Sequence, residues 1–319
     1  MPVPLPRLTI NAEHARLPKQ MTRAVMASNG EADVAMRVTA RVRFAGLTPL
    51  LALAPAGVLI GLLGVCSLLI LRLSFGERGA EWSSWSLDAY ATLADRYYLV
   101  IVLDTLWLAL LSAVITTIVA FPIALYMTRT PSPLMRRAVL ISVMLPMVAS
   151  LLVQSFGWMA ILGPDGLLNQ TVALMIGQER AVSLLFNRTG VLLGLVQTTI
   201  PLAVLPMVAA LAAIPVELEE AASDLGASRL TAYRTIILPL AWPGIAAGAV
   251  LVFGFNTGAF AVPLLLGGLK VTTIAILISN EMGSSLNWPL GAALSVVLVA
   301  LALGLQALNR LGVPRGRQA

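Results

Sequence analysis

The chain of 319 residues is 58% hydrophobic and only 11% charged, and its mean hydropathy is +0.89. Soluble domains carry about 25% charged residues, so a chain with less than half that share must present most of its surface to lipid. The composition excludes an ordinary soluble protein and predicts an all-α, polytopic membrane protein. The single cysteine, Cys66, and the single histidine, His14, exclude a disulfide framework and a histidine-based metal or acid–base site in the membrane.

The first segment, residues 1–45, is polar and basic, which predicts a cytoplasmic tail that is partly disordered. Six apolar segments follow, each close to the ~20 residues that span the hydrocarbon core of a bilayer. They lie at Leu47–Leu71, Leu99–Met127, Ala138–Leu162, Val191–Ala213, Trp242–Leu266 and Pro289–Leu308. We therefore expect a transmembrane domain of six helices over residues 46–312, followed by a short cytoplasmic tail at 313–319.

The distribution of basic residues predicts the orientation of these segments. If the N-terminus is inside, most of the 21 Lys and Arg residues fall in the tails and loops on the cytoplasmic side, as the positive-inside rule requires. Both termini are then cytoplasmic, and so is the long connection between the fourth and fifth segments. The net charge of +6 reflects these basic cytoplasmic regions, and no nucleic-acid partner is expected.

The connection at 214–241 is the most informative polar stretch of the chain. Pro215 can open a helix, and the glutamates that follow suit the positive end of the helix dipole. Gly226 is expected to break this helix at a position where φ is positive. A second short helix follows and is expected to end at Pro239. An ordinary connector is the alternative, but about 25 residues is long for a link between two helices.

The spacing within this loop resembles that of a known family. Glu220-Ala221-Ala222 is followed by three residues, Gly226, nine residues and Ile236-Ile237-Leu238-Pro239. This pattern resembles the EAA loop of permease subunits of ABC importers, the cytoplasmic element that docks on the ATPase. Further segments resemble the spermidine/putrescine (polyamine) type of permease. They are Gln154–Trp158, Leu162–Asn169, Asn187–Gly190, Leu205–Met207, Phe260–Gly268 and Asn287–Ala293, and the resemblance covers about Leu47 to Leu311.

The resemblance implies a type I (MetI-like) permease fold and a place in the bacterial inner membrane. It implies a dimer of ABC ATPase subunits, a second homologous permease subunit, an extracytoplasmic solute-binding protein and the lipid bilayer as partners. The residues expected to dock on the ATPase are Glu220, Ala221, Ala222, Asp224, Gly226, Tyr233, Ile236, Leu238 and Pro239. The chain has no phosphate-binding loop, so ATP and Mg²⁺ are expected on the partner ATPase. The chain itself is expected to bind no cofactor or metal and to be a transport subunit rather than an enzyme.

The translocation pathway is less marked in the sequence. Intramembrane polar and aromatic residues are candidates because their burial in lipid is costly. The candidates are Gln154, Trp158, Gln197, Asn256, Phe260 and Asp104. Aromatic faces and a carboxylate would suit a polyamine cation. The alternative is that these side chains hold helices together, and the glycine pairs Gly57/Gly61, Gly190/Gly194 and Gly244/Gly248 are expected to allow close helix packing.

Two other classes of protein compete with the importer hypothesis. An ATP-independent secondary transporter or channel would predict ionisable residues in mid-span and an internal repeat, and neither is evident. A membrane enzyme would need a cluster of catalytic side chains, and none converges in the sequence. Within the importer hypothesis, the alternative substrates are opines, amino-acid derivatives and organophosphonates, because the separate binding protein does most of the selection.

Overall fold

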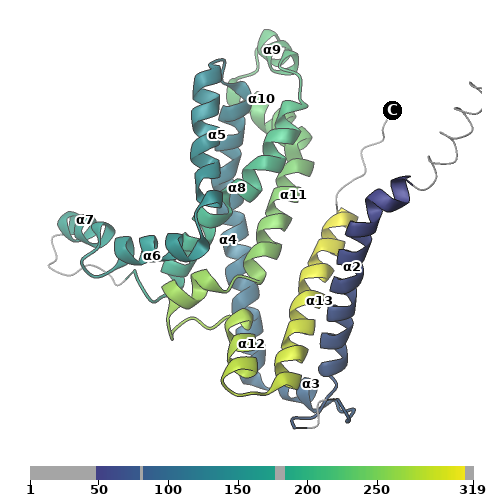
Figure 1. The fold of residues 1–319 in the computed structure, drawn as a ribbon. Helices are drawn as coiled ribbons and strands as arrows, with labels where there is room; N and C mark the ends of the chain where they lie inside the picture. The colour runs from purple at the N-terminus through teal and green to yellow at the C-terminus, as the bar shows by residue number, and fades with distance from the viewer. Residues whose placement is uncertain (1–47, 80–81, 177–183, 313–319) are drawn as a thin grey trace, which may run out of the picture. The chain divides into compact units, whose positions relative to one another are not determined.

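The computed structural model describes residues 48–79, 82–176 and 184–312 (Figure 1). The expectations for the tails at 1–45 and 313–319 lie outside these residues. The chain divides into two units, Met1–Ser67 and Leu68–Ala319. The described part of the first unit belongs to helix α2 (Thr48–Leu73), whose apolar residues Leu53–Leu73 are numerous enough to cross a bilayer.

The second unit is built from helices that follow one another through short turns. They are α3 (Asp88–Leu93), α4 (Arg96–Arg129), α5 (Pro133–Val148), α6 (Leu151–Leu162), α7 (Leu167–Ile176), α8 (Arg188–Ala212), α9 (Glu217–Asp224), α10 (Arg229–Ala232), the π-helical turn η1 (Tyr233–Ile237), α11 (Leu238–Thr257), a second π-helical turn η2 (Pro263–Gly267), α12 (Ile274–Gly283) and α13 (Trp288–Gly312). The all-α fold predicted from the composition is confirmed.

The core of this unit is the packing of α4, α8 and α11 against one another. Small side chains make the approach close, because α4 contributes buried alanines such as Ala120 and Ala124. On α11, a Cβ placed on Gly244 would lie 2.3 Å from the Cβ of Ala210, and one on Gly248 would lie 3.0 Å from the Ala203 carbonyl oxygen. The predicted role of this glycine pair in close packing is therefore confirmed.

The other two glycine pairs differ from each other. A Cβ on Gly190 would lie 2.5 Å from the Leu184 carbonyl oxygen, and one on Gly194 would lie 2.8 Å from Cγ1 of Val262, so this pair also permits close approach. The packing expected of Gly57 and Gly61 stays a prediction, because both residues lie in the first unit, whose described part is α2 alone.

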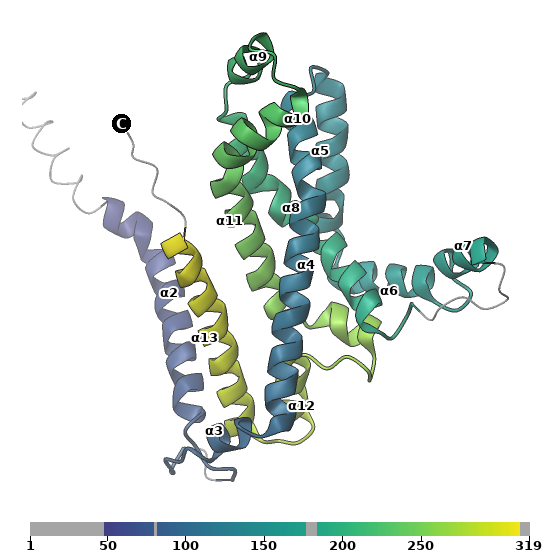
Figure 2. The same cartoon turned by 180° about the vertical axis from the view of Figure 1, so that it is seen from behind.

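Five helices of the described chain are long and apolar enough to cross a membrane. The last predicted segment corresponds to α13, which runs for 25 residues and contains the apolar stretch Trp288–Gly304. In both views, α9 and α10 lie at one end of α8 and α11, and α12 lies toward the opposite end (Figures 1 and 2). The loop predicted to dock on a partner therefore lies at one tip of the helical bundle.

The third predicted segment, Ala138–Leu162, is not one continuous helix. Helix α5 ends at Val148, and α6 begins at Leu151, with extended backbone at Ala149 and Ser150. The side-chain amide of Gln154 donates to the carbonyl oxygens of Pro146 and Ala149, which α5 leaves unpaired at its C-terminus. Hydropathy alone did not reveal the break because both pieces are apolar.

The predicted end of the second loop helix at Pro239 is also wrong. Residues Arg229–Thr257 form one continuous helical rod, in which Pro239 and Pro243 are interior. The turn η1 explains this continuity, since the Leu238 N–H donates to the Tyr233 carbonyl in an i→i+5 bond. This wider turn accommodates a proline that has no N–H of its own to donate. The rod ends at Thr257, short of the predicted Leu266, and η2 follows.

Candidate functional site

The bend at Gly226 is a Schellman motif. Gly226 has φ +82°, as predicted from the sequence. Its N–H donates to the Ser223 carbonyl at 2.9 Å, and the Ala227 N–H donates to the Ala222 carbonyl at 3.0 Å. These two bonds satisfy carbonyls at the C-terminus of α9, and the left-handed residue that they require is most easily a glycine. Ser228 then caps α10 by accepting from the Thr231 N–H at 3.2 Å.

Helix α9 has two opposite faces. At 100° per residue, Glu217, Glu220 and Asp224 fall on one side, while Glu219 and Ala222 fall on the other. The first three are exposed, Ala222 is buried and Glu219 is half-buried. Leu225, which follows the helix, is 89% exposed. The exposed surface of α9 and the residue after it therefore combines three carboxylates with two large apolar side chains, Leu225 and the 40% exposed Leu218.

The residues predicted to dock on an ATPase do not share one environment. Glu220, Ala221, Asp224, Gly226, Leu238 and Pro239 are exposed, Ala222 is buried, and Tyr233 and Ile236 are half-buried. Tyr233 and Ile236 pack against the core cluster, together with the fully buried Ile237. Glu220, Ala221 and Asp224 come just before the bend at Gly226, whereas Leu238 and Pro239 are exposed at the start of α11. The half-buried Tyr233 and Ile236 anchor the rod to the bundle.

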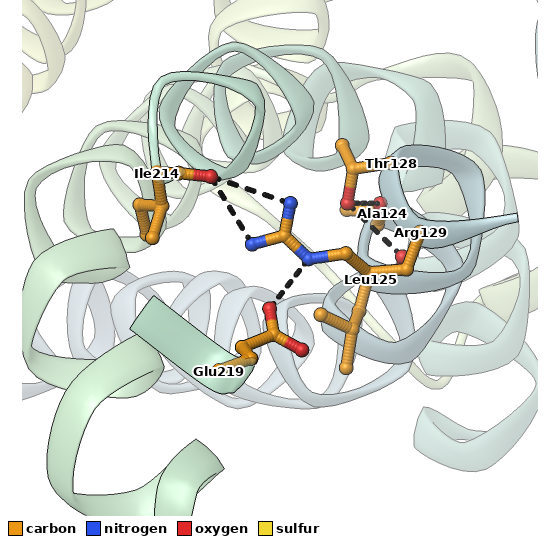
Figure 3. A network of polar contacts seen from close by, with 6 residues as sticks. All are labelled: Ala124, Leu125, Thr128, Arg129, Ile214 and Glu219. Atoms are coloured by element: carbon orange, nitrogen blue, oxygen red, sulfur yellow. Dashed lines mark hydrogen bonds and ion pairs between the residues drawn. The ribbon is translucent and has the colours of Figure 1, made fainter. Parts of the chain in front are cut away.

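Sequence reasoning missed the residue that ties α9 to the bundle. Arg129, the last residue of α4, donates from Nε to Oε1 of Glu219 at 2.6 Å (Figure 3). Its two terminal nitrogens donate to the Ile214 carbonyl at 3.4 and 3.3 Å. The side chains of Arg129 and Glu219 are only 15% and 19% exposed. The two partners are 90 positions apart in the chain, so no local pattern could have paired them.

The six pathway candidates are distributed over several contacts rather than one site. The Trp158 indole N–H donates to the Gln197 side-chain oxygen at 3.1 Å and so links α6 to α8. Asn256, which is buried, donates to the Ser112 hydroxyl at 2.7 Å and links α11 to α4. These contacts match the alternative in which polar side chains hold helices together.

The remaining candidates lie elsewhere. Gln154 caps α5, as described above. Asp104 accepts from Arg188 at 2.6 Å in an exposed ion pair that joins α4 to the start of α8. Phe260 is 40% exposed and lines a half-open pocket of about 470 Å³, in which Phe255 and Thr198 also take part. Of the six candidates, Phe260 is the one that the structure places on the wall of this pocket.

Comparison with known proteins identifies the class of protein to which this architecture belongs. The chain matches the family of binding-protein-dependent transport system inner membrane components over residues 42–318. The spermidine/putrescine transport system permease protein PotB of Haemophilus influenzae is 33% identical over 238 residues, covering 74% of this chain and 83% of the relative. The inner membrane ABC transporter permease protein YdcU of Escherichia coli is 34% identical over 224 residues, covering 66% and 71%.

A solved structure shares the fold. A chain of a bacterial alginate ABC transporter, solved in complex with an alginate pentasaccharide-bound periplasmic protein, superposes with a TM-score of 0.70 at 21% identity. The superposition covers 82% of this chain and 92% of that chain. The family match and the relatives, together with the apolar helices, show that the protein is a multi-pass inner membrane permease subunit and not an enzyme. It belongs to the family of inner membrane components of binding-protein-dependent transport systems.

Proposed function

We propose that this chain forms half of the translocation pathway of an ABC importer for polyamines such as spermidine and putrescine. A second, homologous permease subunit forms the other half, and a dimer of ATPase subunits on the cytoplasmic side supplies the energy. An extracytoplasmic binding protein delivers the substrate. Both termini are then cytoplasmic. The substrate class is supported by the names of the relatives and by the polyamine-type segments of the sequence.

The observation that carries the proposal is the outward face of α9. Glu217, Glu220 and Asp224 project on one side of a short helix at the tip of the bundle, with the exposed Leu225 beside them. Exposed carboxylates are well solvated by water, whereas burial of an exposed leucine against a partner lowers the free energy. A complementary surface would offer a recess for Leu225 and basic groups for the carboxylates. This is a suitable surface for docking on an ATPase.

The rod from Arg229 to Thr257 gives the docked loop a mechanical connection to the membrane helices. Its helical hydrogen bonds continue from the loop through η1 into α11, which packs on α4 and α8. A rigid element of this kind can transmit a displacement of the loop when the ATPase closes on ATP. Because the connection is a continuous helix and not a flexible linker, a displacement of the loop is expected to move α11 with it.

The test is purification of the tagged chain from its native host in mild detergent, followed by transport in liposomes. We expect an ABC ATPase and a second permease to co-purify, and uptake of labelled spermidine to require ATP and the matching binding protein. Recovery of a functional chain alone would favour an ATP-independent transporter. ATP-dependent uptake of an opine, amino-acid derivative or organophosphonate in place of spermidine would contradict only the proposed substrate.

A further inference from the structure

We infer that Arg129 is a coupling residue that makes the docking loop move as one body with the ends of α4 and α8. This inference rests on the proposed function, because it assumes that α9 is the part of the chain displaced by the ATPase. It adds a second link, independent of the rod that begins at Arg229. The link consists of the contacts of Arg129 with Glu219 and with the Ile214 carbonyl.

The covalent connections of α9 do not by themselves hold its position. On its N-terminal side, residues 213–216 form turns around Pro215, and on its C-terminal side the chain bends at Gly226. Helix α9 is only 8 residues long, so its own burial against the bundle is small. Among the described residues, Glu219 is the side chain of α9 with a hydrogen bond to another helix. Arg129 therefore contributes a large part of the restraint on α9.

The geometry suits a guanidinium group. Its planar fork serves a carboxylate and a backbone carbonyl at once, whereas a lysine ammonium acts as a single point charge. Arg129 lies in the last turn of α4 and Glu219 in the first turn of α9, so each charge also faces a favourable helix dipole. Both side chains are largely shielded from water, which strengthens the ion pair relative to one on the open surface.

Figure 3 shows the two partners of the guanidinium: the terminal nitrogens face the Ile214 carbonyl, and Nε faces the carboxylate of Glu219. Ile214 lies two residues beyond Ala212, the last residue of α8, and its own N–H donates to the Leu211 carbonyl. Arg129 thus joins three elements at one point: the end of α4, the end of α8 and the start of α9. A displacement of α9 without α4 and α8 would break the ion pair and leave two shielded charges without their partners.

The experiment uses the complete transporter, purified with its native partners and reconstituted in liposomes. For each variant, we would measure the amount of ATPase bound, the basal rate of ATP hydrolysis and the stimulation of hydrolysis by the substrate-loaded binding protein. The variants are Arg129→Gln, Arg129→Lys and Glu219→Gln. Arg136→Gln is the matched control, because it removes the same positive charge from an exposed side chain nearby.

We expect Arg129→Gln and Glu219→Gln to retain bound ATPase and basal hydrolysis but to lose the stimulation by at least about fivefold, within the usual range of coupling energies. Arg129→Lys should retain an intermediate stimulation of hydrolysis, because lysine keeps the positive charge but lacks the planar guanidinium that bonds to two acceptors at once. The double variant Arg129→Gln/Glu219→Gln should be no worse than the poorer single variant, since both changes break one link. The Arg136→Gln control should behave as wild type.

Two results would overturn the inference while leaving the proposed function intact: normal stimulation in Glu219→Gln, or a loss of bound ATPase that fully accounts for the lost stimulation. If Arg129→Gln fails to fold, Glu219→Gln decides, because it leaves the bond between Arg129 and Ile214 in place. If the wild-type chain binds no ATPase, the proposed function itself is wrong, and this inference is wrong with it.

Discussion

The bend at Gly226 allows a quantitative prediction. A glycine can be needed there for its left-handed backbone conformation or for the space that a partner protein occupies, and the two needs can be tested separately. The residue has φ +82°, and a Cβ placed on it would meet no atom within 4 Å. Within this chain, substitution therefore costs only backbone strain, which for an L-residue in a left-handed conformation is about 1–2 kcal/mol. A change of this size shifts the population of the native bend by a factor of roughly 5–30.

The substitutions Gly226→Ala, Gly226→Asn and Gly226→Val should then form a graded series. Asparagine tolerates the left-handed region best, alanine less well, and β-branched valine least. Hydrogen exchange at the amides of Gly226 and Ala227, which close the Schellman motif, reports the bend directly. Retention of the ATPase during purification reports how a change in the bend affects docking. Gly157→Ala is the matched control, since Gly157 is helical and its Cβ would also lie in open space.

We expect faster exchange and weaker retention of the ATPase in the order asparagine, alanine, valine, with Gly157→Ala unchanged. If alanine at position 226 left both measurements unchanged, the argument from backbone conformation would be refuted. If asparagine and alanine at position 226 reduced ATPase retention equally but left hydrogen exchange unchanged, glycine would be needed there to leave space for a partner and not for its backbone conformation. Gly226→Trp should abolish coupling under either requirement.

Three further predictions concern packing, charge and the pathway. Gly244→Leu should lower the thermal stability by several degrees or prevent folding, because overpacking of a tight contact such as that with Ala210 costs about 1–3 kcal/mol or more. Glu220→Gln should weaken ATPase retention most clearly at low salt, where exposed charges are least screened, and an unchanged salt dependence would contradict this. Asn256→Leu should lower the melting temperature by several degrees, since it removes the bond to Ser112 that links α11 to α4 and puts a larger side chain in a buried site. An unchanged melting temperature together with a loss of transport would instead place Asn256 on the pathway.

The class of protein and the bend in the docking loop could be predicted from the sequence because both depend on local properties. Hydropathy and length reveal membrane-spanning helices, and a glycine between two short helical patterns marks a left-handed bend. Gly226 fulfils that prediction. Close helix packing at Gly244 and Gly248 could also be predicted, since small residues at a spacing of four recur at close helix contacts, although the sequence did not indicate that the partner is α8.

The positions at which helices end or continue could not be predicted from hydropathy and single residues. Hydropathy does not register the hydrogen-bond pattern of the backbone, so the interruption between Val148 and Leu151 was missed. Conversely, Pro239 was expected to end a helix, whereas a π-helical turn carries the helix through it. The contact of Arg129 with Glu219 depends on how α4 and α9 meet in space, and one sequence contains no signal for such a meeting.

The most direct test of the account is to ask what lies against Leu225 in the assembled transporter. A photo-crosslinking amino acid placed at this 89% exposed position should capture the ATPase subunit in native membranes, and the adduct should be identifiable by mass spectrometry. The matched position is Leu174 in α7, which is 84% exposed and lies in the predicted external part of the chain. Capture of the ATPase from Leu225 but not from Leu174 is the predicted result. Equal capture from both positions, or none from Leu225 in an actively transporting complex, would contradict the proposal that this loop docks on the ATPase.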